Sequence, residues 1–184
     1  MENYMKILKF FSLLLILTNL SDIAISSASS SSSESTRDIR REISLGERID
    51  TTADAFNADP NSSTLVNFLK AVANYANFLE GADRLGSTVG VDKHAVCKDA
   101  IQRVQHLRGG ALLHVDPAKI ITTSGGERAQ LDVVWVSGKD VYVYDFKFGG
   151  AKSDTFQRKK YERALTERYP GRTIHKLIEI HPRN

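Results

Sequence analysis

The sequence predicts an α+β (mixed α/β) fold in which helices come first and a small sheet follows. Apolar residues recur at helical spacing over residues 43–108, and after Gly109 they alternate with the period of a β-strand. The chain has 184 residues, of which 41% are hydrophobic and 26% charged, with a formal net charge of +3. This composition is typical of one folded domain and excludes a multi-span membrane protein. The single cysteine, Cys97, excludes an internal disulfide and a thiolate-rich zinc site.

The first 28 residues are typical of an export signal. Lys6 and Lys9 precede an apolar stretch at residues 10–20, and a small-residue site ends at Ala28. An uncleaved membrane anchor is the alternative, which is disfavoured because a membrane span takes about 20 apolar residues. We therefore expect residues 1–28 to be a removed signal peptide and the protein to be secreted, with no stable membrane anchoring after cleavage.

Two further segments are expected before the sheet. Serine dominates residues 29–42, which predicts a flexible linker. Residues 43–92 are expected to form a helical N-terminal extension, with a helix from about residue 60 to residue 79. Another apolar stripe predicts a helix over residues 93–107, which would open the core domain at residues 93–184.

The core domain is expected to follow the order α, β, β, β, α, β. Asp154 is placed to cap its second helix, which would end near Tyr169, before Pro170-Gly171. The strands are expected at residues 119–123, 129–136, 140–148 and 173–180.

The central hairpin carries the chemistry that the sequence suggests. A two-residue turn at Gly138-Lys139 would place Asp132 opposite Asp145, with Lys147 on the same face. Facing carboxylates destabilise strand pairing, but a divalent cation such as magnesium or manganese removes the repulsion. The alternative is a solvated face whose charges point into water. The other face would hold Leu131, Val133, Trp135, Tyr142, Tyr144 and Phe146.

The helix after the hairpin adds a cationic surface. Gln157 and Tyr161 are four residues apart and so share one helical face. Residues 147–184 contain ten Lys or Arg against four Asp or Glu. A basic helix beside two carboxylates and a lysine favours a bound phosphate backbone over a merely solvated helix. The candidate nucleic-acid-binding residues are Gln157, Tyr161, Arg158, Lys159, Lys160 and Arg163.

These motifs resemble a known family. Asp132 followed by Asp145-Phe146-Lys147, in the order α-β-β-β-α-β, is similar to the PD-(D/E)xK nuclease superfamily, whose fold is called restriction-endonuclease-like. Gln157 and Tyr161 match the QxxxY motif of its RecB-like branch. The hairpin also resembles the nuclease domains of secreted toxins. The resemblance covers about half of the chain, residues 93–184.

The resemblance implies roles for individual residues. Asp132 and Asp145 would be catalytic and would ligate Mg²⁺ (or Mn²⁺), with Lys147 as the catalytic lysine. The backbone carbonyl of Phe146 would be a further metal ligand. The family often adds a glutamate from the first core helix, which residues 93–107 lack. Glu80 is the candidate substitute that we retain, and the other candidates are Asp99 and Glu127.

The expected function is therefore that of a secreted, metal-dependent nuclease, a hydrolase of phosphodiester bonds with low sequence specificity. Nucleic acid is the expected partner, with DNA favoured over RNA. A toxin or effector role would add a host or immunity protein as a second partner. The alternative is a catalytically inactive nuclease fold that binds nucleic acid or a partner protein.

Overall fold

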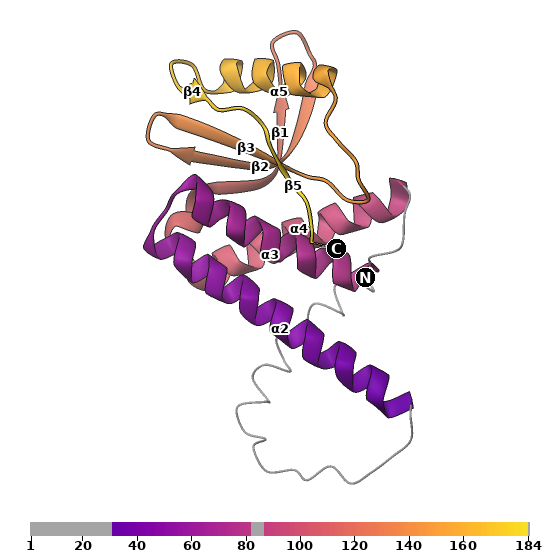
Figure 1. Ribbon diagram of the computed structural model, residues 1–184. Coiled ribbons are helices and arrows are strands. Elements are labelled where there is room, and N and C mark those ends of the chain that lie inside the picture. Colours follow the sequence, from indigo (N-terminus) through magenta and orange to yellow (C-terminus); the bar gives the residue numbers. More distant parts are fainter. Residues whose placement is uncertain (1–30, 82–86, 184) are drawn as a thin grey trace. The chain divides into compact units, whose positions relative to one another are not determined.

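The computed structural model describes residues 31–81 and 87–183 (Figure 1). The expected signal peptide, residues 1–28, lies outside these ranges. The chain divides into two compact units, residues 1–47 and 48–184. None of the helices in the described ranges is both long enough and apolar enough to cross a bilayer.

The first described helix, α2, covers Ser31–Ala58. Residues 31–42 are therefore helical, and the expectation of a flexible linker there is wrong. Opposite charges at helical spacing, such as Asp38 and Arg41, favour a helix that serine content alone does not predict.

The next two helices are α3 (Ser62–Leu79) and α4 (Ser87–Arg108). The Asn61 side chain caps α3 by accepting from the N–H groups of Ser63 and Thr64. The expected domain boundary before Lys93 falls inside α4, because the helix runs through Gly90. A glycine inside a helix costs only about 1 kcal/mol. Burial of one stripe of α4 offsets this cost, through Val96, Cys97, Ile101 and Val104.

A short 3₁₀ helix, η1 (Gly110–His114), leads into a mixed five-stranded sheet. β1, β2 and β3 are antiparallel neighbours, and both β4 and β5 pair with β3 in parallel. The predicted hairpin register is confirmed, because Ser137 pairs with Asp140 and Val133 with Tyr144. The strands are β1 (Val115–Thr122), β2 (Arg128–Ser137), β3 (Asp140–Phe146), β4 (Thr173–Ile174) and β5 (Ile178–Ile180).

The expected last strand is thus two short strands, separated by residues 175–177. His175 in this gap stacks on Tyr142, with ring centroids 4.2 Å apart, and its Nε2 lies 2.8 Å from Asp140 Oδ1. The second core helix, α5 (Thr155–Arg168), precedes these strands and begins at the predicted cap, Asp154.

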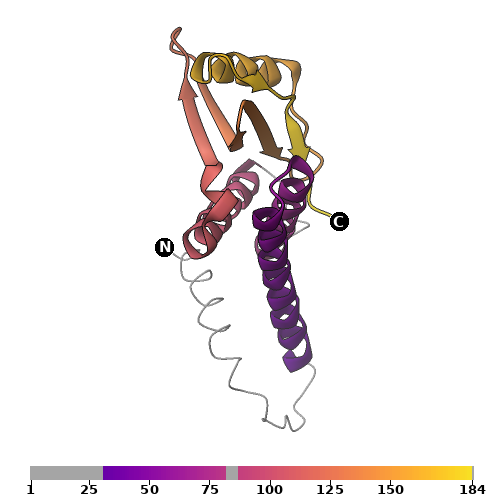
Figure 2. The ribbon, with the colours of Figure 1, turned by 90° about the vertical axis from the view of Figure 1, so that its left-hand side faces the viewer.

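Within residues 48–184, helices cover both faces of the sheet. The Ser62 and Tyr144 hydroxyls, 3.2 Å apart, join α3 to β3 on one face, where Phe56 also packs edge-on against Trp135. On the other face, α5 packs through Tyr161, Ala164 and Leu165. Figures 1 and 2 show α5 on the opposite side of the sheet from α3 and α4.

The side-chain alternation of β2 changes phase at Asp132. Leu131 and Val134 both belong to the cluster under α5, although residues three apart in a regular strand point to opposite faces. Leu131 therefore does not share a face with Trp135, contrary to expectation. On β1 the residue opposite Asp132 is Ala118, whose φ of 53° lies in the left-handed region. Both strands are thus distorted where Asp132 leaves the regular ladder.

We expect Ala118→Gly to raise the free energy of unfolding by up to about 1 kcal/mol. A left-handed φ costs an alanine about 1–2 kcal/mol, and glycine avoids this cost while losing part of the gain to unfolded-chain entropy. The matched control is Ala129→Gly, on the neighbouring strand, where alanine is fully buried and has no positive φ. Urea denaturation should show opposite signs for the two variants. Equal destabilisation by both would contradict strain at Ala118.

Candidate active site

Two aspartates meet where β2 and β3 separate. The last backbone pair of the hairpin joins Val133 to Tyr144, one residue before Asp132 and Asp145 come opposite each other. The Phe146 N–H donates to Asp132 Oδ2 over 2.8 Å. Beyond Tyr144, β3 is no longer paired with β2 and is paired only with β5, on its other edge. The carboxylates therefore lie in the fork between diverging strands.

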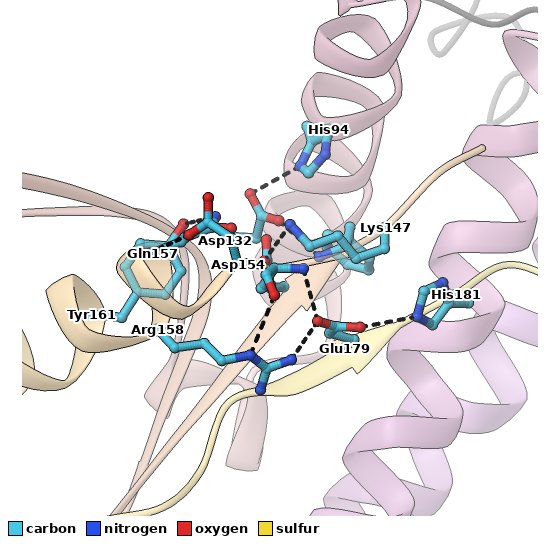
Figure 3. A network of polar contacts seen from close by, with 12 residues as sticks. His94, Asp132, Lys147, Asp154, Gln157, Arg158, Tyr161, Glu179 and His181 are labelled. Carbon is cyan, nitrogen blue, oxygen red and sulfur yellow. Dashed lines mark hydrogen bonds and ion pairs between the residues drawn. The ribbon is translucent and has the colours of Figure 1, made fainter. Parts of the chain in front are cut away.

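Asp145 is buried and held by two donors. Only 3% of the residue is exposed to solvent. Lys147 Nζ lies 2.5 Å from Asp145 Oδ2, and the Ser153 hydroxyl donates to the same oxygen over 2.7 Å. Lys147 therefore does share the site with the carboxylates, as the sequence predicted (Figure 3).

His94, on α4, is a residue of the site that the sequence interpretation missed. Its Nδ1 lies 2.9 Å from Asp132 Oδ1 (Figure 3), and its ring packs edge-on against Phe148. The family resemblance implies a glutamate on this helix, not a histidine. The signal that could have revealed His94 is its position seven residues before buried Ile101, on the stripe that faces the sheet.

The surroundings of the two aspartates shift their pKa values in opposite directions. Burial is the largest influence on Asp132, but the hydrogen bond and charge of His94, with donation from Asp145 and Phe146, lower its pKa below the ordinary value. Burial raises the pKa of Asp145, and the contact with Asp132 raises it further. Lys147 and Ser153 oppose that rise only in part. As the pH falls, Asp145 therefore takes up a proton before Asp132 does.

A second carboxylate network supports Asp145 from β5. Glu179 is the register partner of Asp145 and accepts a hydrogen bond from the Ser153 N–H over 2.9 Å. Arg158 donates to Glu179 over 2.6 Å, and His181 lies 3.4 Å from its other oxygen. The Ser153 N–H is the main cause of a lowered pKa of Glu179, to which Arg158 and His181 add. Ser153 thus links the two carboxylates.

The residues predicted to bind nucleic acid fall into three groups. Gln157 and Tyr161 bind each other, because Gln157 Nε2 donates to the Tyr161 hydroxyl over 2.6 Å. Burial, together with the charges of both aspartates, raises the pKa of Tyr161 to about 12, so this pair lies beside the site. Arg158 is engaged by Glu179, and Arg163 by Glu127 over 3.0 Å. Across the described ranges, no ion pair holds the remaining two, Lys159 and Lys160.

Glu80 does not join the aspartates. It is buried at the C-terminal cap of α3. Among residues 31–81 and 87–183, no group of three or more His, Cys, Asp or Glu side chains is gathered as a metal cluster. Asp132, Asp145 and the backbone of Phe146 are nevertheless adjacent, and they offer the hard oxygen donors that Mg²⁺ and Mn²⁺ prefer.

The raised pKa of Asp145 predicts a pH signature in protein kept metal-free with EDTA. Because the folded pKa lies above the ordinary value of 3.8, the folded state binds a proton first as the pH falls. The contribution of Asp145 to stability should therefore grow as the pH drops from the raised pKa towards 3.8, and level off below. Thermal unfolding of wild-type and Asp145→Asn protein from pH 7 to pH 4 measures it. An identical pH dependence in both proteins would contradict the assignment.

Comparisons with known proteins gave no match to a family model, to a curated protein or to a solved structure. The function of this chain must therefore be inferred from its own side chains. The arrangement to be explained is two contacting carboxylates, one of them bound by a lysine, at a fork in the sheet.

Proposed function

We propose that this protein is a metal-dependent nuclease that hydrolyses phosphodiester bonds. The observation that supports this most is the contact between Asp132 and Asp145 in a largely buried fork, with Lys147 on Asp145. Two carboxylates in contact repel each other, and Lys147 and Ser153 offset only part of the resulting rise in the pKa of Asp145. Stability alone does not account for such a pair, whereas a hydrolase acting on phosphate needs one.

The donors at the fork fit a hard divalent cation. Asp132 and Asp145 would hold Mg²⁺ or Mn²⁺, with the Phe146 carbonyl as a further oxygen donor and His94 holding Asp132 in place. A bound cation would supply charge to polarise a phosphate and to lower the pKa of water.

The side chains of the chain itself have distinct tasks in this proposal. Lys147 places an ammonium beside Asp145, where it would orient the attacking water and stabilise the charge that develops on the phosphate. Ser153 keeps the Asp145 carboxylate in one orientation through its hydroxyl. Lys159 and Lys160, which are not held by ion pairs with the described residues, would contact the backbone phosphates of the substrate. Contacts to backbone phosphates do not distinguish one base from another, so we expect the enzyme to have low sequence specificity.

The element order agrees with the proposed family. Apart from η1 and the two-residue β4, the elements from α4 onwards follow the order α-β-β-β-α-β, and we infer that they form a restriction-endonuclease-like core. We also keep DNA as the favoured substrate over RNA, and export from the producing cell as the setting. An exported nuclease used as a toxin would need an immunity or host protein as a partner.

The direct test is incubation of the purified full chain with circular DNA, linear DNA and RNA, with Mg²⁺ or with EDTA. We expect cleavage with Mg²⁺ and none with EDTA, since the proposed mechanism needs the cation that Asp132 and Asp145 would hold. Cleavage that persists in EDTA would refute the metal-dependent mechanism. Nucleic-acid binding without any cleavage would instead indicate a catalytically inactive fold.

A further inference from the structure

An aromatic side chain in the first turn of α5 has no packing role that explains it. Phe156 is 71% exposed, whereas the other aromatic residue of α5, Tyr161, is 6% exposed. Burying a phenylalanine is worth about 2 kcal/mol, so an exposed one three residues after Ser153 can add to the binding of a ligand at the fork.

The two flanks of α5 face different parts of the molecule. One flank carries Phe156, Lys160 and Arg163, which are spaced i, i+4 and i+7 and so form one stripe. Arg163 and Glu167 bind Glu127 and the Ser124 N–H, which places this stripe on the side of the β1–β2 hairpin. The opposite flank lines a cavity of about 260 Å³ against β3, β4 and the residues that follow β4.

Phe156 lies within a short reach of the fork. Ser153, whose hydroxyl binds Asp145, is three residues before it, and three residues span at most about 11 Å. Asp132 is on β2, which begins directly after Glu127, the partner of Arg163 on the Phe156 stripe. The Phe156 backbone therefore lies within about 11 Å of Ser153, a reach comparable with one or two nucleotides.

The charges beside Phe156 favour an anionic partner. Lys160 is on the same stripe and Lys159 adjoins it, and neither is held by an ion pair with any residue of the described ranges. We propose that Phe156 is a base-stacking residue, and that the site takes a single-stranded or frayed nucleic acid whose phosphates contact Lys159 and Lys160. This proposal rests on the proposed nuclease function.

A phenylalanine at this position favours a single-stranded ligand over a duplex. A phenyl ring makes no strong contact with a phosphate, and in a duplex the faces of the bases are already stacked on each other. An unpaired base offers a free π-face, on which an aromatic side chain stacks without regard to sequence. The low sequence specificity expected for the enzyme is thus compatible with a preference for single strands.

Fluorescence anisotropy of the full chain in EDTA tests the proposal without cleavage. The probes are a labelled single-stranded DNA, its duplex, and the same strand carrying abasic sugars in place of its nucleosides. We expect Phe156→Ala to bind the single strand about tenfold more weakly and to bind the duplex and the abasic strand as wild type does. Phe156→Trp should keep wild-type affinity, and Phe156→Leu should behave like the alanine variant.

The matched control is Leu113→Ala, which removes an apolar side chain that is 65% exposed and should change no affinity. An unchanged single-strand affinity in Phe156→Ala, or an equal loss on duplex and abasic strands, would overturn the stacking role. So would full affinity of Phe156→Leu for the single strand, because an aliphatic side chain has no aromatic ring on which a base could stack. Mg²⁺-dependent cleavage of the single strand and of a plasmid by wild type separates the two hypotheses, because the absence of cleavage on both substrates refutes the nuclease function while the anisotropy decides the stacking role.

Discussion

Asp145→Asn should reduce Mg²⁺-dependent cleavage by at least about 1,000-fold while leaving the protein folded. Asparagine keeps the shape of the side chain and can still accept from Ser153 and Lys147. It removes the charge that would hold the cation and the repulsion with Asp132. We therefore expect the free energy of unfolding of metal-free protein at pH 7 to stay within about 1 kcal/mol of wild type, or to rise.

The matched control for this variant lies on the same strand. Asp140→Asn makes the same chemical change five residues away, where the carboxylate is partly exposed and binds His175. Its cleavage rate should equal that of wild type. Rates measured on a plasmid, with circular dichroism of each variant, decide the result. Full activity in Asp145→Asn, or equal losses in both variants, would remove Asp145 from the active site.

The central part of the site could be predicted because it depends on local geometry. A two-residue turn fixes the register of a hairpin, so the meeting of Asp132 and Asp145 followed from the position of Gly138. The Asp154 cap and the Gln157–Tyr161 contact likewise depend only on helical spacing.

The contacts that were missed join elements far apart in the sequence. His94 reaches Asp132 from α4, and Glu179 reaches Ser153 from β5. Helical or strand periodicity within one element cannot show which elements pack together. The phase change at Asp132 was missed for the same reason, because it involves the left-handed Ala118 on the neighbouring strand.

At residues 31–42 the serine content and the spacing of the charged residues predict different structures. The serine content predicts a flexible linker, whereas charges at helical spacing favour a helix, and α2 does include these residues. The six candidate nucleic-acid-binding residues, similarly, were grouped by charge and spacing alone. The structure separates them, because acceptors from β5 and from the β1–β2 hairpin engage Arg158 and Arg163.

Lys147→Met should lower the cleavage rate by about 100- to 1,000-fold, because it removes a charge aimed at the reacting phosphate. Methionine retains much of the length and volume of lysine, so the buried stem stays packed. The hydrogen bond from Lys147 lowers the pKa of Asp145, and its loss should raise that pKa further. Because a metal and a proton compete for Asp145, the residual activity of the variant should require a higher pH than wild type does.

This upward shift distinguishes an electrostatic role of Lys147 from a purely structural one. The control is Lys152→Met, five residues further on, where the side chain is exposed and the rate and pH profile should match wild type. Initial rates from pH 5.5 to pH 9, at a Mg²⁺ concentration that half-saturates wild type at pH 7, give both quantities. A reduced rate with an unshifted profile would mean that Lys147 acts on the phosphate without tuning Asp145. An unchanged rate would mean that the amine has no part in the chemistry, and the nuclease mechanism proposed for this fork would be wrong.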